Sequence, residues 1–442
     1  MKESCLIIAH DFPPFAGGGV MRIHKFVKYL PEFSISPAVL TIKEKYYPST
    51  DSSLLNEYSY PVDIYRTATI DLKKIYLYFK RNKKNHKTSE IAGVDNTSFF
   101  SKLCDNISAC LLIPDFKILW FPFALINALR ILKKHNIKKI ITTAPPHSVN
   151  LIGLALKIIK PEIIWIADFR DTWTQNEIYS YPLNLIKKIE EKMEYQVFKT
   201  ADCIICATDS VKESFIEKYG SPIIKKEKFE VITNGYDEED FQDLKEAVPA
   251  GRSDTILKIL YSGSLNDWRN LDNFCKALKK LEAENKIDFS KIKIKLCGHI
   301  PAAEYDRINE LELSSIFEFV KIEPHKESIK RMAEADLLLL IISDIEGKVV
   351  LTGKLFEYIG SGKTVFGIVP ATGEAEKIIN KYNIGITADT SSVTDISKKL
   401  HKIYFEYFNT GCLKYNSDDE FKNKFSRKKL TEKFAGLIKK CN

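Results

Sequence analysis

The chain has 442 residues, which is too long for one ordinary domain and predicts two or three. The composition is globular, with 45% hydrophobic and 28% charged residues, and the net charge of +8 fits anionic phosphate ligands or an anionic membrane surface. The basic residues are dispersed and are not interleaved with aromatic ones along one stretch, so nucleic-acid binding is not predicted. No apolar run is long enough to span a bilayer and no signal peptide is visible, so we expect a cytoplasmic protein.

An apolar strand is predicted over residues 5–9, followed by a loop with two prolines and three consecutive glycines, Gly17, Gly18 and Gly19. Prolines end a strand, and glycines permit positive φ and a close approach of the backbone to a ligand. A helix over 20–30 follows and carries Arg22 near its start. The spacing is not GxGxxG, which argues against a dinucleotide site, and a plain strand-to-helix turn stays the alternative.

Residues from about 70 to 135 are predicted to form a helical, basic insert in the N-terminal domain. Helices are predicted over 72–79, 99–112 and 122–135, with the basic run KRNKKNHK over 80–87. Apolar helix faces beside lysine clusters fit a surface that contacts a bilayer. The alternative is a helical hairpin packed on the domain beside a solvated basic loop.

Two further strands of the first half end in polar residues. The strand over 138–143 runs into His147, and the strand over 162–167 runs into Asp168, Arg170 and Asp171. Buried charges are costly unless they are paired, so this group is hard to explain as core. The structural alternatives are a core histidine and an ion pair of Arg170 with one aspartate.

The nine cysteines do not predict a metal or redox site. Cys203 and Cys206 have CxxC spacing, but they lie in an apolar strand over 201–208, where residues three apart point to opposite faces. No second pair lies nearby, so we interpret these side chains as buried thiols in a reducing compartment.

The order of strands and helices predicts two doubly wound α/β domains. About six strands alternate with helices in an N-terminal domain over 1–237, and a polar linker follows over 238–255. A second domain over 256–418 repeats the pattern, with strands over 256–261, 292–297, 317–322, 335–342 and 365–369. A basic amphipathic helix over 419–442 is expected to pack back on the N-terminal domain.

The segment GKLFEYIGSGK, from Gly353 to Lys363, lies between two predicted strands of the second domain. In open α/β folds, ligands bind at the carboxyl ends of the strands. Lys354 and Glu357 are three residues apart and share a helix face, and a helix start beside glycines suits phosphate. A carboxylate one turn further along the helix can accept hydrogen bonds from ribose hydroxyls. The alternative is that the helix only packs on the sheet and that its charged side chains are solvated.

These motifs, in this order, resemble the GT-B fold glycosyltransferases, specifically glycosyltransferase family 4. The matching stretches are PP with GGG near the start, ITTAPPHS, WIADFRDTW, ITNGYD, YSGSL with Arg269, and GKLFEYIGSGKTV. The resemblance implies two Rossmann-like doubly wound domains with an interdomain cleft. It also implies transfer of a sugar from a nucleotide-sugar with retention of configuration and without an essential metal or other cofactor. The donor would bind the second domain and the acceptor the first.

The resemblance also assigns roles to individual residues. On the donor side, Glu357 would bind the ribose, and Arg269, expected on a helix after Gly263, would hold the diphosphate with Lys354. Gly263 would let the backbone approach, and the three glycines Gly17 to Gly19 would face the phosphates across the cleft. On the acceptor side, Asp168 or Asp171 would orient or deprotonate the acceptor hydroxyl. His147 would hydrogen-bond the sugar, and Arg22 and Arg170 would line this side.

Two departures from the family pattern leave alternatives open. Val349 stands where the family often has a second glutamate, and Ser264 stands where it often has arginine. Another activity on nucleotide-sugars, such as epimerisation or hydrolysis, and a sugar-nucleotide-binding scaffold are therefore alternatives. Proteins of this kind commonly build bacterial O-antigen, capsule or exopolysaccharide on polyprenyl-diphosphate carriers at the inner face of the cytoplasmic membrane. The sequence does not identify the base, the sugar, the acceptor, the linkage or the oligomeric state.

Overall fold

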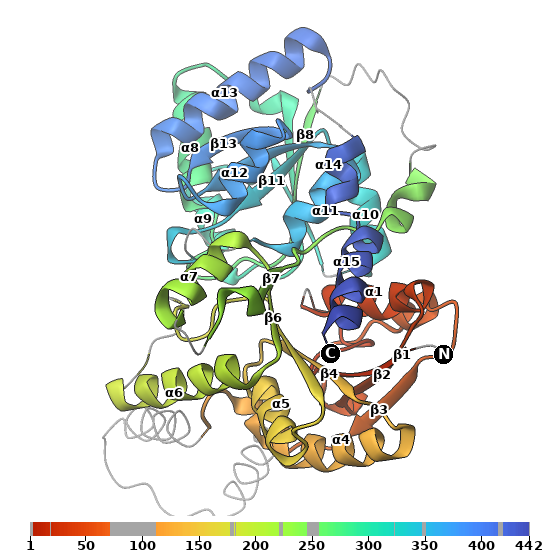
Figure 1. Cartoon of the computed structure of the whole chain (residues 1–442). Coiled ribbons are helices and arrows are strands. Elements are labelled where there is room, and N and C mark those ends of the chain that lie inside the picture. Colours follow the sequence, from red (N-terminus) through yellow and green to blue (C-terminus); the bar gives the residue numbers. More distant parts are fainter. Residues whose placement is uncertain are drawn as a thin grey trace, which may run out of the picture. The chain divides into compact units, whose positions relative to one another are not determined.

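The computed structural model describes residues 3–17, 19–70, 112–176, 181, 183–220, 224–244, 256–321, 323–346, 351–413 and 419–441. Gly18, Val349, the predicted segments over 72–79 and 80–87, and all of the predicted helix over 99–112 except Leu112 lie outside the described residues. The chain forms two compact units. The first consists of residues 1–207, 212–231 and 434–442, and the second of residues 208–211 and 232–433. Each unit is built around its own sheet (Figure 1).

The first unit contains a seven-stranded parallel sheet with the order β3-β2-β1-β4-β5-β6-β7. Its strands are β1 Glu3–Ile8, β2 Ile35–Ile42, β3 Asp63–Thr67, β4 Lys139–Ala144, β5 Ile164–Phe169, β6 Cys203–Cys206 and β7 Phe229–Val231. Its helices are α1 Val20–Tyr29, α4 Phe121–His135, α5 Ser148–Ile159, α6 Asn184–Thr200 and α7 Asp209–Tyr219. The expected count of about six strands was one short, because β3 is a half-exposed edge strand without a continuous apolar run.

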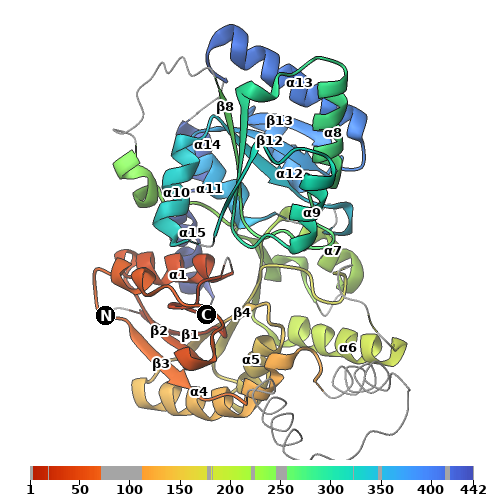
Figure 2. The same cartoon turned by 180° about the vertical axis from the view of Figure 1, so that it is seen from behind.

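The second unit contains a six-stranded parallel sheet with the order β10-β9-β8-β11-β12-β13. Its strands are β8 Leu257–Ser262, β9 Ile292–Cys297, β10 Phe317–Val320, β11 Leu337–Ile341, β12 Thr364–Val369 and β13 Gly385–Asp389. Its helices are α8 Asp272–Ala283, α9 Ala302–Glu310, α10 His325–Glu334, α11 Gly353–Ser361, α12 Glu374–Lys381, α13 Val393–Thr410 and α14 Asp419–Lys424. Both sheets are doubly wound, as predicted, and helices cover both faces of each (Figures 1 and 2).

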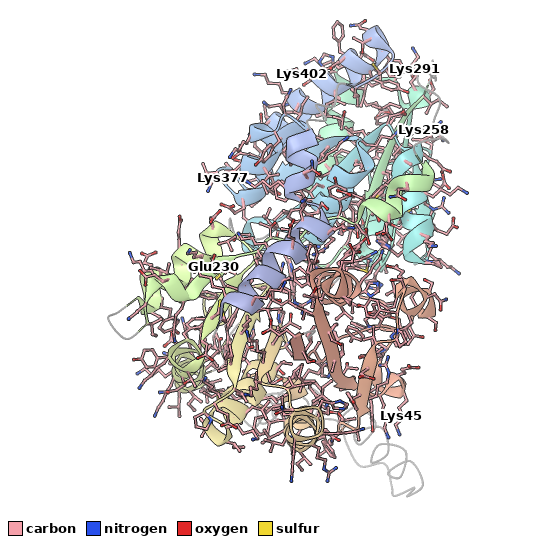
Figure 3. The ribbon with its side chains drawn as sticks, turned by 45° about the vertical axis from the view of Figure 1, so that its right-hand side comes forward. Lys45, Glu230, Lys258, Lys291, Lys377 and Lys402 are labelled. Carbon is pink, nitrogen blue, oxygen red and sulfur yellow. The ribbon has the colours of Figure 1, made fainter. Side chains whose placement is uncertain are left out.

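The strand β11 explains why the sequence around it is continuously apolar. Leu337, Leu339 and Ile341 belong to the core on the side of α8 and α13, whereas Leu338 and Leu340 belong to the core on the side of α10 and α11. A parallel strand with helices on both faces has no solvent-facing side, so its residues do not alternate between apolar and polar. Charged side chains such as Lys291, Lys377 and Lys402 point outward from this unit (Figure 3).

The C-terminal segment forms two helices where one was expected. The helix α14 ends at Lys424, and α15 spans Arg427–Lys440. The break has a tertiary cause, because Tyr236 forms a parallel bridge with Ser426 and its carbonyl accepts the Arg427 N–H at 2.8 Å. The last residues belong to the first unit, where the Phe434 ring lies 4.6 Å from that of Phe26.

A charged cluster fixes α1 against the 3-10 helix η3, Ser52–Glu57. The Glu57 carboxylate accepts hydrogen bonds from Lys25 Nζ at 2.7 Å and His24 Nε2 at 3.0 Å. Burial raises the pKa of Glu57, but the hydrogen bond from His24 and the Lys25 charge outweigh it and lower that pKa to about 2. The pKa of His24 is lowered by burial, so its neutral ring donates to Glu57 and accepts from Tyr58.

Across the described part of the chain, none of the helices has the length and apolar character that crossing a bilayer requires.

Candidate functional site

The helix α11 is anchored beneath the carboxyl edge of the second sheet by its apolar face. Leu355, Phe356, Tyr358 and Ile359 are fully buried. The Tyr358 hydroxyl accepts the N–H of Ser262 at 3.1 Å and donates to the carbonyl of Leu339 at 3.2 Å. One phenol thus links the end of β8 to the middle of β11, the two strands between which the strand order reverses. Ligands of open α/β sheets bind at this point, so α11 is positioned for function.

Lys354 lies directly over the glycine that follows β8. A Cβ atom on Gly263 would be 1.9 Å from Lys354 Cε and Nζ, and Gly263 has a φ of +142°, so only glycine fits. The Lys354 ammonium donates to the Tyr261 hydroxyl at 3.1 Å and lies 4.6 Å from the centre of its ring. This contact between Lys354 and Gly263, which the sequence did not predict, puts a cation at the carboxyl end of β8.

Glu357 points from the next turn of α11 toward His325, the first residue of α10. The distance from His325 Nε2 to Glu357 Oε1 is 3.2 Å, and the carboxylate must be the acceptor. The Glu357 side chain is 24% exposed, so a ligand can reach it. Sequence reasoning did not select His325, because the strand before it ends at Val320 and the start of α10 carries no motif.

Arg269 lies in a loop and not on a helix as expected. The helix α8 begins only at Asp272, and the Asn266 side chain accepts the Arg269 N–H at 2.8 Å and holds the loop. The neighbouring Trp268 and Asn270 line a cavity of about 400 Å³ beyond the carboxyl ends of β11 and β12. None of its described lining residues is lysine or arginine, and neither Lys354 nor Arg269 is among them.

The start of α11 offers polar groups that the described residues leave unused. Thr352 precedes the helix and makes no capping hydrogen bond, and its buried hydroxyl has no partner among the described residues. A buried hydroxyl without a partner is uncommon and costs about 1–3 kcal/mol. The first N–H groups of a helix also lack helical acceptors, so this end suits an anion.

In the first unit, Asp168 forms a buried ion pair with Arg22. Its two carboxylate oxygens accept from the Arg22 guanidinium at 2.8 and 3.1 Å, and Oδ2 also accepts from the Thr143 hydroxyl at 2.9 Å. Both charged side chains are 2% exposed. One of the two aspartates that could have paired with Arg170 therefore pairs with Arg22, from a helix 146 residues away in sequence.

Arg170 instead ties three loops together through backbone carbonyls. It donates to the carbonyls of Gly19, Ala144 and Pro145, and it has no carboxylate partner among the residues that the structure describes. A Cβ on Gly19 would lie 2.5 Å from Arg170 Nη1. Neither Gly17 nor Gly19 adopts the positive φ that glycine permits. The glycine at 19 is needed for the close approach of Arg170.

His147 is buried against Trp173, with the two rings stacked 4.8 Å apart and nearly parallel. Trp173 Nε1 donates to the Glu190 carboxylate of α6 at 2.8 Å and thereby fixes the stack. Neither ring nitrogen of His147 has a partner among the described residues. Burial, and secondarily the Arg170 charge, lower the pKa of His147 to about 3, so its ring is neutral at physiological pH.

The structure adds His10 and Asp11, which sequence reasoning did not select. They follow β1, and His10 Nδ1 lies 2.6 Å from Asp11 Oδ1. Asp171, which was selected, is half-buried in the loop after β5. The only sequence signal for the new pair was a His-Asp dipeptide directly after a buried strand.

Residues 89–240 match the family model for Glycosyltransferase Family 4. The chain has the GT-B fold and resembles glycosyltransferase family 4. No curated protein matches it.

Several solved GT-B structures align over nearly the whole chain. The Anabaena protein HepE in complex with UDP and glucose is 13% identical and has a TM-score of 0.65, with 99% of each chain covered. Sucrose-phosphate synthase from Thermosynechococcus elongatus is 13% identical with a TM-score of 0.66, covering 99% of this chain and 98% of its own. WaaG, a glycosyltransferase of lipopolysaccharide biosynthesis, is 13% identical with a TM-score of 0.57, covering 98% of this chain and 100% of its own. At these identities the likeness establishes the GT-B fold.

Proposed function

We propose that the protein is a retaining glycosyltransferase that moves a sugar from a nucleotide-sugar to a glycan or a polyprenyl-diphosphate-linked acceptor. The observation that carries the proposal is the arrangement of Lys354 over Gly263 at the point of strand reversal, with Glu357 one turn further on the same helix. A cation and a carboxylate at this spacing match the diphosphate and the ribose of one nucleotide. The family match over residues 89–240 supports the same activity.

The diphosphate of the donor would be held by fixed positive groups. These groups would be Lys354, Arg269 and the first N–H groups of α11, and the Thr352 hydroxyl would be a further hydrogen-bond donor. The departing nucleoside diphosphate gains negative charge as the sugar leaves, and preorganised cations and helix N–H groups stabilise such charge. We propose that these groups suffice without a metal ion. Glu357, held by His325, would accept hydrogen bonds from the ribose hydroxyls.

The first unit would bind the acceptor. Among the described residues, Arg170 donates hydrogen bonds only to carbonyls, so its positive charge would be left for an anion such as the acceptor diphosphate. The neutral His147 would hydrogen-bond a sugar hydroxyl through a nitrogen without a partner. The aspartates Asp168 and Asp171 were predicted to orient or deprotonate the acceptor hydroxyl. The Arg22 pair already occupies both oxygens of Asp168, which leaves Asp171 as the better candidate of these two.

A bacterial setting in surface polysaccharide assembly, peripheral on the cytoplasmic membrane, completes the proposal. The basic net charge of +8 and the predicted apolar and basic segments over 72–112 are its support. Deleting residues 72–112 should weaken binding to anionic liposomes, and unchanged binding would count against the membrane part.

A donor screen tests the function first. UDP-, GDP-, ADP- and CMP-sugars are compared by thermal shift, starting with UDP-glucose because HepE was solved with UDP and glucose. A ligand at about 100 times its dissociation constant adds about 2.7 kcal/mol of stability. Turnover with the best donor is then measured with and without lipid-linked acceptors. Product without acceptor would indicate hydrolysis or epimerisation, and binding without turnover would indicate a scaffold.

Site variants test the donor side. Glu357→Ala and Arg269→Ala should each lower donor turnover at least about tenfold, which corresponds to about 1.4 kcal/mol. Glu310→Ala, an exposed carboxylate at the end of α9, is the matched control and should change nothing. Wild-type turnover in both site variants would refute the assignment.

A further inference from the structure

Asp11 lies at the ligand-binding edge of the first sheet. It follows β1, and the strand order of this sheet reverses between β1 and β4, so their carboxyl ends border the expected ligand crevice. The Asp11 side chain is 28% exposed, whereas that of Asp168 is 2% exposed. Asp11 Oδ1 is bound by His10, and Oδ2 accepts no hydrogen bond from any of the described residues. One carboxylate oxygen is therefore available to a ligand.

The backbone around Asp11 is held in place although it is neither helix nor strand. The carbonyl of His10 accepts hydrogen bonds from the Thr41 hydroxyl at 2.9 Å and the Tyr47 hydroxyl at 3.0 Å. The N–H of Phe12 donates to the same Tyr47 hydroxyl at 3.3 Å, so the residues on both sides of Asp11 are tied to one phenol. A group held this way needs little reorganisation when a substrate binds.

The surroundings of Asp11 keep it ionised. Burial raises its pKa, but the hydrogen bond and charge of His10, and then the charges of Arg170 and Lys117, bring the pKa below its usual value. These groups come from the loop after β1, from the loop after β5 and from the 3-10 helix before α4. An ionised carboxylate accepts a hydrogen bond from an alcohol, which a protonated one does less well.

We infer that Asp11 is the carboxylate that accepts the proton of the acceptor hydroxyl. The inference rests on the proposed function and replaces Asp168 and Asp171 in this role. The acceptor oxygen bonds to the anomeric carbon on the face from which the diphosphate departs, so that the configuration is retained. The bond from that carbon to the diphosphate oxygen breaks, and its electron pair leaves with the nucleoside diphosphate. The hydroxyl proton passes to Asp11 Oδ2, which becomes a neutral carboxyl group, and the products are the glycoside and the nucleoside diphosphate.

His10 acts as a positioning residue for Asp11. It is 2% exposed, its ring packs edge-on against Trp120 with the centres 5.5 Å apart, and its Nδ1–H donates to Oδ1. The ring thereby orients the carboxylate so that Oδ2 stays free for the acceptor. His10→Asn retains an N–H donor near the position of Nδ1, whereas His10→Phe removes it.

The test compares Asp11→Asn with Asp171→Asn, and with Asp63→Asn as an exposed carboxylate control on β3. Initial transfer rates are measured with a saturating donor and acceptor, and donor binding is measured separately by calorimetry. Asp11→Asn should lower the transfer rate at least about 100-fold, the range expected for a lost proton acceptor, with donor affinity unchanged. Asp63→Asn should match the wild type, and Asp171→Asn should lose less than about tenfold.

Two further measurements separate chemistry from folding. External formate should restore part of the activity of Asp11→Ala, because a small carboxylate can occupy the vacated space, and a purely structural role would not respond. His10→Asn should retain more activity than His10→Phe.

The outcomes for the inference and for the function are distinct. Transfer within threefold of wild type in Asp11→Asn, or a 100-fold loss in Asp171→Asn alone, would overturn the inference while leaving the glycosyltransferase function intact. A wild-type protein that binds donors but transfers to none of the acceptors would overturn the proposed function itself.

Discussion

Replacing Asp168 by asparagine tests the buried ion pair between β5 and α1. The substitution keeps the shape of the side chain but removes its charge, and it leaves the Arg22 guanidinium buried without a counter-charge. The pair has two contacts of 2.8 and 3.1 Å and both side chains are 2% exposed. Breaking a buried pair of this kind costs about 3–5 kcal/mol. In a unit of this size the loss corresponds to a melting temperature lower by about 6–20 °C.

Calorimetry on the full chain measures the effect. The two units are expected to give separable transitions, and a nucleotide that binds only the second unit identifies its transition by stabilising it. The Asp168→Asn loss should appear in the first unit. Combining Asp168→Asn with Arg22→Met should recover at least half of the loss, because the unpaired charge is then absent.

The same variant distinguishes a structural from a catalytic Asp168. If the pair is structural, stability falls by several kcal/mol, and transfer measured well below the melting temperature falls by less than in Asp11→Asn. Stability within about 1 kcal/mol of wild type, together with abolished transfer, would refute this reasoning and return Asp168 to the role that the sequence predicted.

Three other predictions follow from single positions. Gly263→Ala should lower donor affinity at least about tenfold by calorimetry, because its Cβ would displace the Lys354 side chain. Gly411→Ala also adds a Cβ at positive φ but meets no atom within 4 Å, so it should cost only about 1 kcal/mol of stability, and equal donor affinity in both variants would contradict the argument. The pKa of Glu57 is about 2 in the folded state, below its usual value. The ionised carboxylate therefore contributes its full stabilisation of the folded state above about pH 4.5, and this contribution is lost as the pH falls toward 2. Glu57→Gln should therefore cost up to about 3 kcal/mol in urea unfolding at pH 7 and progressively less below pH 4.5, and a pH-independent difference would count against the cluster. The pKa of His147 is about 3 when folded and 6.5 when unfolded, so wild type loses stability as the pH falls from 6.5 to 3. His147→Phe should keep the Trp173 stack, lack this pH-dependent loss, and transfer sugar more slowly; wild-type transfer rates would remove His147 from the site.

The local pattern of the chain determined most of the fold. Apolar runs and the turns between them predicted nearly all the strands that carry the two sites, because a strand buried on both faces must be apolar throughout. The helix α11 was also predictable, since Leu355, Phe356 and Ile359 recur at helical spacing, which leaves Lys354 and Glu357 on the other face. The edge strand β3 and the break before Arg427 were not predictable, because each depends on partners distant in sequence.

The tertiary structure decided which charged groups are available for chemistry. Sequence motifs placed Asp168, Arg170 and Asp171 side by side at one strand end, but ion pairing depends on which element packs opposite that end. Arg22, from α1, pairs with Asp168, whereas backbone carbonyls hold Arg170 in place without neutralising its charge. Asp11 belongs to no sequence motif, and only the tertiary structure shows that its loop is held by Tyr47. The spacing of residues along the chain determines the secondary structure, whereas the packing of the strand ends determines which carboxylate remains exposed to a substrate.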